Sequence, residues 1–379
     1  MGGLAAALAC SRAGWEPRIY EQANQLAEVG AGIQLGPNAT RILAAWGLQP
    51  ALSWVAAVPQ ELQARSALDG AALGRLQLGE AFEQRYGAPY LTIHRADLQR
   101  VLADAVQAAS VPVTLSARVT SVLPCDDGVR IRINDEREAE GDVLLAADGL
   151  WSRVRAAVIG DGLPAATGHV AYRALVAQNA LPSNLRSHGV TVWLGPRMHV
   201  VAYPVKAGEQ LNVVAIVQGR SAGAASDWNQ RGAAAELQAA MGPVCAPLED
   251  LIRAMPSWQL WTLHDRPPVR SAGEMARGRV ALLGDAAHPM RPYLAQGAGM
   301  ALEDAAELGR ALAASVAGID VQTLLRRYAM NRWERCAKVQ ARAQRNGQIF
   351  HATGLVQWAR NLSMRLVGEP LLDQPWLYH

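Results

Sequence analysis

The segment GDAAHPMRPYLAQGAGM, residues 284–300, is the most informative stretch of the 379-residue chain. It follows the apolar run VALL at 280–283, which is typical of a buried strand. Asp285 comes directly after this strand, where a carboxylate can hold the hydroxyl groups of a ribose-like polyol. Gly297 and Gly299 then open a helix whose bare amides and dipole favour negative charge on a bound group. The pattern predicts a strand, a ligand-binding turn and a helix.

Two further turns of the same kind occur earlier in the chain. In LLAADGLWSRVR, residues 144–155, a buried strand ends at Asp148-Gly149, where glycine tolerates the positive φ of a sharp turn, and Ser152 can cap a short helix. At the start, MGGL opens directly into a small-residue helix, and Glu21 ends the next short strand, where an acid can bond ribose hydroxyls. Taken alone, a routine strand–turn–helix remains the alternative for residues 144–155, and an alanine-rich helix followed by an ordinary edge strand remains the alternative for the start of the chain.

Composition and charge exclude several classes of protein. Hydrophobic residues make up 50% of the chain and charged residues 18%, as in a globular protein, and a dispersed net charge of +3 gives no reason to expect nucleic acid as a partner. No apolar run reaches membrane-spanning length, and the first residues lack the basic start of a signal peptide. The four cysteines lack metal-ligand or CxxC spacing. We therefore expect a cytoplasmic protein with reduced thiols, no metal and no membrane partner.

The pattern of apolar and polar residues changes twice along the chain. An α/β pattern is followed by alternating β-rich runs such as 190–194 and 199–205, and the α/β pattern then returns. The expected organisation is a discontinuous nucleotide-binding domain, a β-sheet domain threaded through it, and a helical C-terminal segment. Their predicted bounds are 1–75, 90–166 and 266–320 for the first domain, 167–265 for the second, and 321–379 for the segment.

The order and spacing of Glu21, Asp148-Gly149 and Gly284-Asp285, with the stretch from His288 to Met300, resemble the single-component flavoprotein hydroxylases. This family includes para-hydroxybenzoate, salicylate and 6-hydroxynicotinate hydroxylases. The resemblance covers essentially the whole chain. It implies an α/β fold: a discontinuous Rossmann-like FAD-binding domain with an inserted, mainly antiparallel β-sheet substrate domain and a C-terminal helical segment.

The resemblance also assigns residues to FAD. It implies that Gly2, Gly3 and Glu21 contact the adenosine half, that Arg95 lies against the cofactor, and that Asp148 and Gly149 lie near the pyrophosphate. Asp285 would hold the ribityl chain. The isoalloxazine ring would be bordered by Pro292, Gly297, Ala298, Gly299 and Met300. An exposed charge at the start of a helix remains the alternative for Arg95, and His288 is interpreted as a structural residue that holds the loop after Asp285.

The strand MHVVAYPV, residues 198–205, suggests the substrate side. His199 and Tyr203 share a face because strand side chains alternate. A His and Tyr at this spacing look like the pair in hydroxylases of hydroxybenzoates and hydroxypyridinecarboxylates, in which a histidine near neutral pKa can help to remove a phenolic proton. Tyr293 is a further candidate catalytic residue from the flavin side. A buried structural histidine and a packing tyrosine remain the alternatives for this pair, and Arg173 and Asn212 are family-like positions without a predicted role.

The reaction that the resemblance implies consumes three small molecules. NADH or NADPH reduces FAD, O2 adds to give a C4a-hydroperoxyflavin, and one oxygen atom passes to a ring carbon beside an activating hydroxyl. The substrate would be a small aromatic acid of the hydroxybenzoate or hydroxynicotinate type. Family members occur as monomers and homodimers, and both states are possible here.

Two other interpretations were considered. A flavin-dependent halogenase would share the fold, but it would need an early lysine and a Trp-x-Trp motif, whereas the first lysine is Lys206 and Trp258 and Trp261 have the wrong spacing. Relatives also have a strand and a Gly-x-Gly before the position of Met1. We therefore expect either poor FAD binding by the chain as given or a true start upstream, and a flavin-free remnant that binds an aromatic ligand without turnover is the non-enzyme alternative.

Overall fold

The computed structural model describes residues 1–26, 31–123, 125, 127–219, 230–314 and 318–378. The chain forms two compact units, each built from three separate stretches. Unit 1 comprises Met1–Glu28, Leu98–Ala165 and His264–Ala343, and unit 2 comprises Val29–Asp97, Ala166–Leu263 and Gln344–His379. Each unit is described on its own.

Unit 1 contains short parallel strands. They form two ladders in the described residues, one of β1 (Ile19–Tyr20) with β6 (Val113–Thr114), the other of β10 (Leu144–Ala146) with β18 (Val280–Leu282), beside which β17 (Ala276–Arg277) runs antiparallel. A separate antiparallel sheet consists of β7 (Val119–Leu123), β8 (Val129–Ile133) and β9 (Arg137–Gly141). In parallel ladders all carboxyl ends meet at one edge, which is where ligands bind in such folds.

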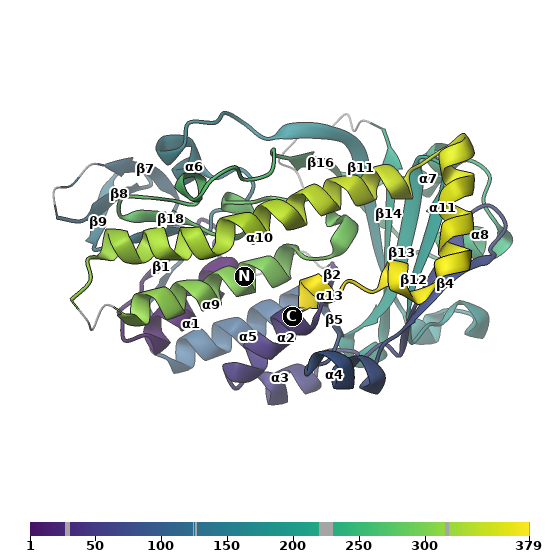
Figure 1. Ribbon diagram of the computed structural model, residues 1–379, viewed down its shortest axis with the longest axis horizontal. Coiled ribbons are helices and arrows are strands. Elements are labelled where there is room, and N and C mark those ends of the chain that lie inside the picture. The colour runs from purple at the N-terminus through teal and green to yellow at the C-terminus, as the bar shows by residue number, and fades with distance from the viewer. Residues whose placement is uncertain (27–30, 124, 126, 220–229, 315–317, 379) are drawn as a thin grey trace. The chain divides into compact units, whose positions relative to one another are not determined.

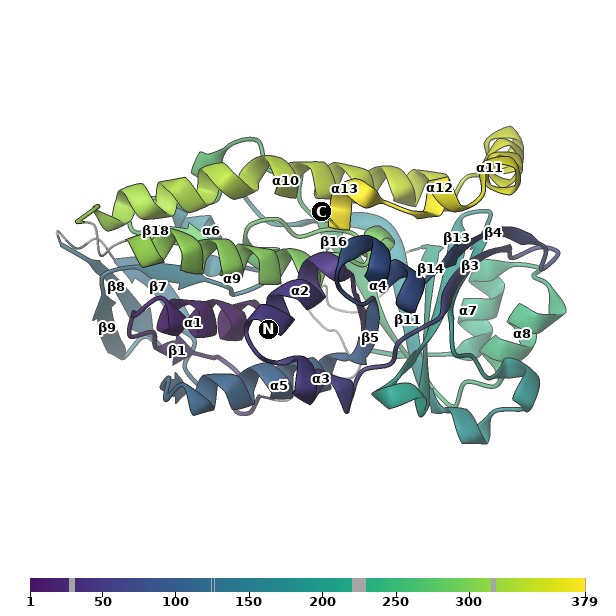
Figure 2. The same cartoon turned by 60° about the horizontal axis from the view of Figure 1, so that its bottom comes forward.

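Two helices of unit 1 pack closely because small residues line their contact. Helix α1 (Gly2–Arg12) is buried from Leu4 to Cys10 and lies beside α9 (Gly297–Ala313), as Figures 1 and 2 show. A Cβ on Gly309 of α9 would lie only 3.1 Å from the Cβ of Ala9. Gly14 has φ +86° and follows the end of α1, as expected for a glycine that terminates a helix. The other helices of the unit are α5 (Arg95–Ala108, from residue 98), α6 (Arg153–Val158), and α10 (Val321–Phe350, to residue 343).

Unit 2 is built around an eight-stranded sheet. The strand order is β15-β16-β11-β14-β13-β12-β3-β4, and β12 pairs in parallel with β3. The strands are β3 (Glu61–Ser66), β4 (Ala72–Gln77), β11 (Ala165–Ala177), β12 (Val190–Gly195), β13 (Met198–Val205), β14 (Gln210–Gln218), β15 (Gln230–Gly232) and β16 (Trp258–Asp265). A two-stranded ribbon of β2 (Gly32–Leu35) and β5 (Leu91–His94) belongs to the same unit.

The two faces of this sheet differ in chemistry. Met198, Val200 and Ala202 of β13 join one hydrophobic cluster with residues of α7 (Ala234–Met241) and α8 (Ala246–Arg253). Figure 2 shows both helices together at the sheet. Because strand side chains alternate, His199 and Tyr203 lie on the opposite, polar face. The remaining helices of unit 2 are α2 (Pro37–Ala45), α3 (Gln49–Ser53), α4 (Glu80–Tyr86), α11 (Gly354–Val367), α12 (Glu369–Leu372) and α13 (Pro375–Tyr378).

The observed division of the chain differs from the predicted domain bounds. Residues up to 75 were expected in the nucleotide-binding domain, but β3 and β4 extend the sheet of unit 2, because β3 pairs with β12 through the register Val190↔Leu62 to Leu194↔Ser66. Residues 321–343 were expected in a separate C-terminal segment, but they belong to unit 1. Among the described residues, no helix combines the length and apolar character needed to cross a membrane.

Candidate functional site

The turns near 148 and 285 lie next to each other in unit 1. β10 and β18 pair in register from Leu144↔Val280 to Ala146↔Leu282, and the Leu283 amide donates to the Ala146 carbonyl at 3.0 Å. Both strands run in the same direction, so Asp148-Gly149 and Gly284-Asp285 leave the same edge of the ladder. The two turns, about 135 residues apart in the sequence, therefore lie side by side in unit 1.

The first residues of α1 lie at the same edge. A Cβ on Gly2 would be in ordinary contact with Leu283 at 3.4 Å and with Ala301 at 3.6 Å, and one on Gly3 would lie 3.5 Å from the Cβ of Ala147. These neighbours directly precede Gly284 and Asp148 or belong to α9. All three glycine-containing segments predicted from the sequence thus meet within one unit.

Arg155, which the sequence analysis overlooked, ties two of these segments together. Its side chain is 3% exposed, and its Nη1 donates to the carbonyls of Ala286 at 3.1 Å and Ala287 at 2.5 Å. Its Nε and Nη2 donate to Asp161 at 2.8 and 2.6 Å. Only its place in a basic helical turn was visible in the sequence, and that gives no sign of burial.

Asp285 is presented outward by an otherwise buried segment. In the fully described stretch 280–289 it is the one exposed residue. Gly284 adopts φ +56°, a left-handed conformation that glycine accepts without strain. Near Gly297 at the start of α9, an added Cβ would meet open space, so a ligand can approach the helix amides closely. Ala298 is half-buried, Gly299 and Met300 are buried, and Pro292 is exposed.

The carboxylates of Asp148 and Glu21 both have local hydrogen-bond partners. Asp148 accepts hydrogen bonds from the Ser152 hydroxyl at 2.5 Å and from the amides of Arg153 and Val154 at 2.9 and 3.2 Å. Ser152 caps α6 as predicted, since its Oγ accepts from the Arg155 amide. Gly149 has φ +76°, as expected. Glu21 follows β1 and accepts from the Ala23 amide at 2.8 Å.

Arg95 and Tyr293 lie in different units. Arg95 is the first residue of α5, its amide donates to the Ala31 carbonyl at 2.9 Å, and by its contacts it belongs to unit 2. Tyr293 belongs to unit 1 and is 4% exposed. Burial, and then the nearby Asp265 against the opposing effect of Arg291, raises the pKa of the Tyr293 phenol well above its ordinary value.

The polar face of the sheet in unit 2 carries a group of hydrogen-bonding side chains around Tyr203. Tyr203 lies opposite Asn212 on the neighbouring strand β14. The Gln34 side chain forms a hydrogen bond with the Tyr203 hydroxyl and accepts one from the Tyr90 hydroxyl at 2.6 Å. Burial raises the pKa of Tyr203 well above its ordinary value, so the phenol is a neutral hydrogen-bonding group at pH 7. Gln34 and Tyr90 were not predicted from the sequence.

The backbone of β2 passes so close to this face that residue 32 has to be a glycine. The Gly32 amide donates to Asn212 Oδ1 at 2.8 Å, and a Cβ on Gly32 would lie 2.5 Å from the Tyr203 ring and 2.8 Å from Asn212 Cγ. Asn212 is 1% exposed, and its Nδ2 finds no acceptor among the described residues. Arg173 shares the polar face, since its neighbour Leu175, two residues on, lies opposite Asn212. Its Nε donates to Gln259 at 2.9 Å, and its guanidinium lies 5.3 Å from the Trp261 ring centroid.

His199 is on the same face as Tyr203 but has different neighbours. Its Nδ1 lies 2.8 Å from Nε2 of His351, and the rings of His169 and His351 are 4.8 Å apart. Burial, and then the rings of His351 and His169, hold the pKa of His199 well below its ordinary value. The structure therefore shows a buried, neutral histidine paired with a second histidine, instead of one with a near-neutral pKa.

His288, Asp304 and Cys336 form a buried group whose atoms could in principle hold a metal ion. Both oxygens of Asp304, however, already accept hydrogen bonds, Oδ2 from His288 Nε2 at 2.5 Å and Oδ1 from Arg332 Nε at 2.8 Å. A guanidinium beside the carboxylate opposes a second cation. We interpret the group as an ion-pair network.

These features define a class of protein. Two parallel strands end in glycine-containing turns with the glycine-rich start of α1 beside them, an exposed carboxylate leaves one buried turn, and α9 opens at Gly297, where an added Cβ would meet open space. This donor set fits FAD, with Asp285 available to polyol hydroxyls and the start of α9 available to an electron-rich ring edge. Unit 1 is a dinucleotide-binding unit of the flavoprotein type.

Comparison with known proteins agrees with this class. The sequence profile of the family described as "FAD binding domain" matches residues 1–343. A 3-hydroxybenzoate 6-hydroxylase of Polaromonas naphthalenivorans is 38% identical over 382 residues, covering 100% of this chain and 93% of that protein. A 6-hydroxynicotinate 3-monooxygenase of Bordetella bronchiseptica is 35% identical and covers 90% of this chain and 87% of its own length.

Solved structures agree as well. The structure of Klebsiella pneumoniae HpxO with FAD and uric acid matches with a TM-score of 0.85 at 28% identity, covering 98% of this chain and 92% of that one. A salicylate hydroxylase substrate complex matches with a TM-score of 0.82 at 26% identity, covering 100% and 92%. The chain belongs to the FAD-binding-domain family. It is an FAD-dependent monooxygenase of the aromatic hydroxylase group, and no comparison favours a flavin-free remnant.

Proposed function

We propose that this chain hydroxylates a small aromatic acid of the hydroxybenzoate or hydroxynicotinate type, with NADH or NADPH and O2 as co-substrates. The observation that carries the proposal is identity of 35–38% over 90–100% of the chain to enzymes named for such substrates. We place the reaction in the cytoplasm, where reduced nicotinamide nucleotides are available, and we expect a monomer or a homodimer.

On the FAD side, the proposal assigns roles to residues of unit 1. Asp285 accepts hydrogen bonds from the ribityl hydroxyls, and the amides of Gly297–Met300, with Pro292 and Tyr293 nearby, border the ring. Gly2, Gly3, Glu21 and the Asp148-Gly149 turn serve the adenosine and pyrophosphate portions, with Arg95 against the cofactor. When bound, FAD would take up the electrons of NAD(P)H and would activate O2. The chain's contribution is to bind, orient and shield it.

The polar face of the sheet in unit 2 supports the substrate assignment. Tyr203 and Asn212 offer neutral hydrogen-bonding groups suited to a ring hydroxyl, and Arg173 offers a cation suited to a carboxylate. His199 is held in its neutral form, and a neutral imidazole can accept a proton. We propose that His199 accepts the phenolic proton of the substrate, which raises the electron density of the ring.

The test is oxidation of NADH and NADPH by the purified, FAD-saturated protein, with and without candidate ligands. The ligand set comprises 3-hydroxybenzoate, 3-amino-4-hydroxybenzoate, salicylate and 6-hydroxynicotinate. At least one is expected to stimulate oxidation tenfold or more and to yield a hydroxylated product that contains one atom from labelled O2. Benzoate, which lacks the activating hydroxyl, is the control and should yield no hydroxylated product.

Two results would contradict the proposed substrate class. If none of these acids stimulates oxidation or yields product while FAD remains bound, the substrate class is wrong. NAD(P)H oxidation that releases hydrogen peroxide without a labelled product is uncoupled turnover, and it also counts against the ligand as a substrate.

A further inference from the structure

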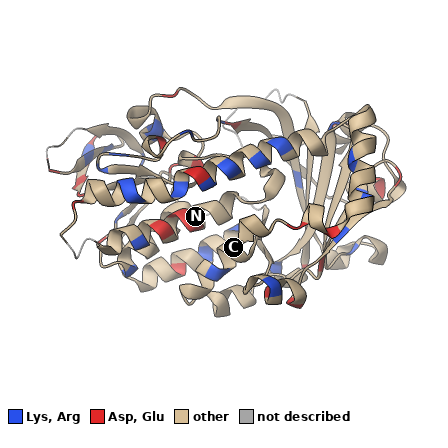
Figure 3. Cartoon of the chain, in the orientation of Figure 1, with Lys and Arg blue, Asp and Glu red and all other residues tan. Residues whose placement is uncertain are grey.

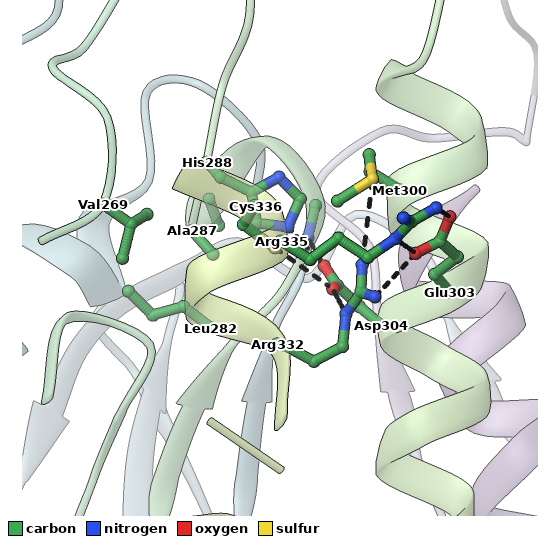
Figure 4. A network of polar contacts seen from close by, with 12 residues as sticks. Val269, Leu282, Ala287, His288, Met300, Glu303, Asp304, Arg332, Arg335 and Cys336 are labelled. Atoms are coloured by element: carbon green, nitrogen blue, oxygen red, sulfur yellow. Dashed lines mark hydrogen bonds and ion pairs between the residues drawn. The ribbon is translucent and has the colours of Figure 1, made fainter. Parts of the chain in front are cut away.

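A buried ionic network lies between α9 and α10, and the proposed function uses none of its charged residues. Asp304 is 0% exposed, His288 1% and Arg332 5%. Arg332 Nη1 donates to Glu303 at 2.6 Å, and Arg335 donates to both oxygens of Glu303 at 2.6 and 2.8 Å. Figure 4 shows these side chains directed toward one another, and Figure 3 shows acidic residues on α9 and basic residues along α10.

Asp304 differs from Glu303 in what it contacts. Its Oδ2 accepts a hydrogen bond from the backbone amide of Gly284 at 2.9 Å as well as from His288 Nε2. The Gly284 carbonyl in turn accepts from the amides of Ala287 and His288 at 3.0 and 2.9 Å. One carboxylate therefore contacts both ends of the tight turn from 284 to 288, and Asp285 is the exposed residue inside that turn.

Helix α10 holds the same segment at three successive points. The Tyr328 hydroxyl donates to the Leu282 carbonyl at 2.9 Å, Arg332 anchors Asp304, and Gln340 Nε2 donates to the Pro289 carbonyl at 2.9 Å. These residues recur at multiples of four along α10 and so fall on roughly one side of the helix. The backbone on both sides of Asp285 is thus fixed by a helix that begins more than thirty residues later in the chain.

The electrostatics keep the network ionised. Burial alone would raise the pKa of Asp304, but the charges of His288 and Arg332 hold it well below its usual range. Burial alone would lower the pKa of His288, but the Asp304 carboxylate raises it well above its ordinary value. A charge-assisted bond to the Gly284 amide is roughly twice as strong as a neutral one, so the turn is restrained more firmly than a neutral acceptor could achieve.

We propose that Asp304 is a positioning residue for FAD: its carboxylate, seated by Arg332, fixes the Gly284–His288 turn and thereby the place of the Asp285 carboxylate. The inference rests on the proposed contact between Asp285 and FAD. It predicts that loss of the Asp304 charge weakens FAD binding without any change in a residue that touches the cofactor.

The test measures the FAD dissociation constant of the full-length apoprotein by flavin fluorescence, together with its unfolding by urea. Asp304→Asn is expected to raise the dissociation constant tenfold or more. Glu303→Gln is the matched control, since it removes an acid of the same network that does not contact the turn. It is expected to leave the dissociation constant within twofold of wild type, whatever stability it loses.

A double-mutant cycle separates positioning from general destabilisation. If Asp304 acts through Asp285, the effect of Asp304→Asn on the dissociation constant largely disappears in an Asp285→Ala background. Independent effects that multiply would contradict the proposal. Should Asp304→Asn fail to fold, His288→Gln, which removes one partner of the carboxylate, is expected to weaken FAD binding threefold or more, and an unchanged constant would overturn the proposal.

The outcomes also distinguish this proposal from the proposed contact between Asp285 and FAD, on which it rests. If Asp285→Ala weakens FAD binding but Asp304→Asn does not, or Glu303→Gln weakens it equally, the positioning role is wrong and the Asp285 contact stands. If Asp285→Ala itself has no effect, or wild type does not bind FAD, the proposed cofactor contact fails and the positioning role fails with it.

Discussion

At the scale of single residues, Gly32 shows how the absence of a side chain shapes the polar face of the sheet in unit 2. We expect Gly32→Ala to lower the free energy of unfolding by about 1–3 kcal/mol, because the new methyl group would collide with Tyr203 and Asn212 in a packed interior. Urea unfolding measures this. Gly273→Ala is the control: its Cβ would meet only Ser271 Oγ at 3.7 Å, and we expect a change within about 0.5 kcal/mol. Equal effects of the two changes would contradict the assigned close approach.

His199 gives a second prediction at this scale. If its neutral ring accepts the substrate proton, activity falls as pH drops through its pKa, and because that pKa is lowered, the acid limb of kcat/KM lies below about pH 6.5. His199→Asn should remove this limb and lower kcat about 10²–10⁴-fold. His188→Asn, at an exposed histidine, is the control and should keep the limb. An unchanged limb in His199→Asn would refute the role.

At the scale of elements, the pairing of α9 with the segment after β18 predicts a pH dependence of stability. The folded-state pKa of His288 is raised above its unfolded value of about 6.5, so its contribution is full below that pH and is lost as pH rises toward the folded pKa. We expect the free energy of unfolding to decline above pH 6.5, by at most about 1.4 kcal/mol per pH unit from this group.

Urea titrations from pH 6 to 9 measure this slope. His288→Gln should be less stable than wild type at pH 6 and should show a flatter pH dependence above it, whereas His188→Gln should keep the wild-type slope. The same slope in His288→Gln and wild type would mean that His288 is not protonated in the folded protein.

Several elements were predicted correctly from the local sequence pattern. The helix after the first glycines, the capped turn at Ser152 and the helix from Gly297 were predicted because caps, glycines and apolar spacing act within a few residues. The place of β3 and β4 in the sheet of unit 2 was not predicted, since the pairing of β3 with β12 joins residues more than a hundred positions apart. Local spacing carries no information about such pairing.

At the scale of the whole molecule, we expect FAD binding to raise the free energy of unfolding. A ligand that binds only the folded state at one hundred times its dissociation constant raises the free energy of unfolding by about 2.7 kcal/mol. We expect urea unfolding of the apoprotein to shift by this amount with FAD, and FMN, which lacks the adenosine half, to shift it less. An unfolding midpoint that does not respond to FAD would favour the flavin-free remnant.

The sequence by itself determined the family, the three glycine-containing segments and the candidate acid at Asp285, because these depend on residue types at short spacing. Only the tertiary structure decided which residues support them. Arg155 against the turn after Asp285, Asp304 beneath Gly284, and His351 beside His199 join residues far apart in the chain. Their burial and charge state arise when distant segments pack together, so no local pattern could have revealed them.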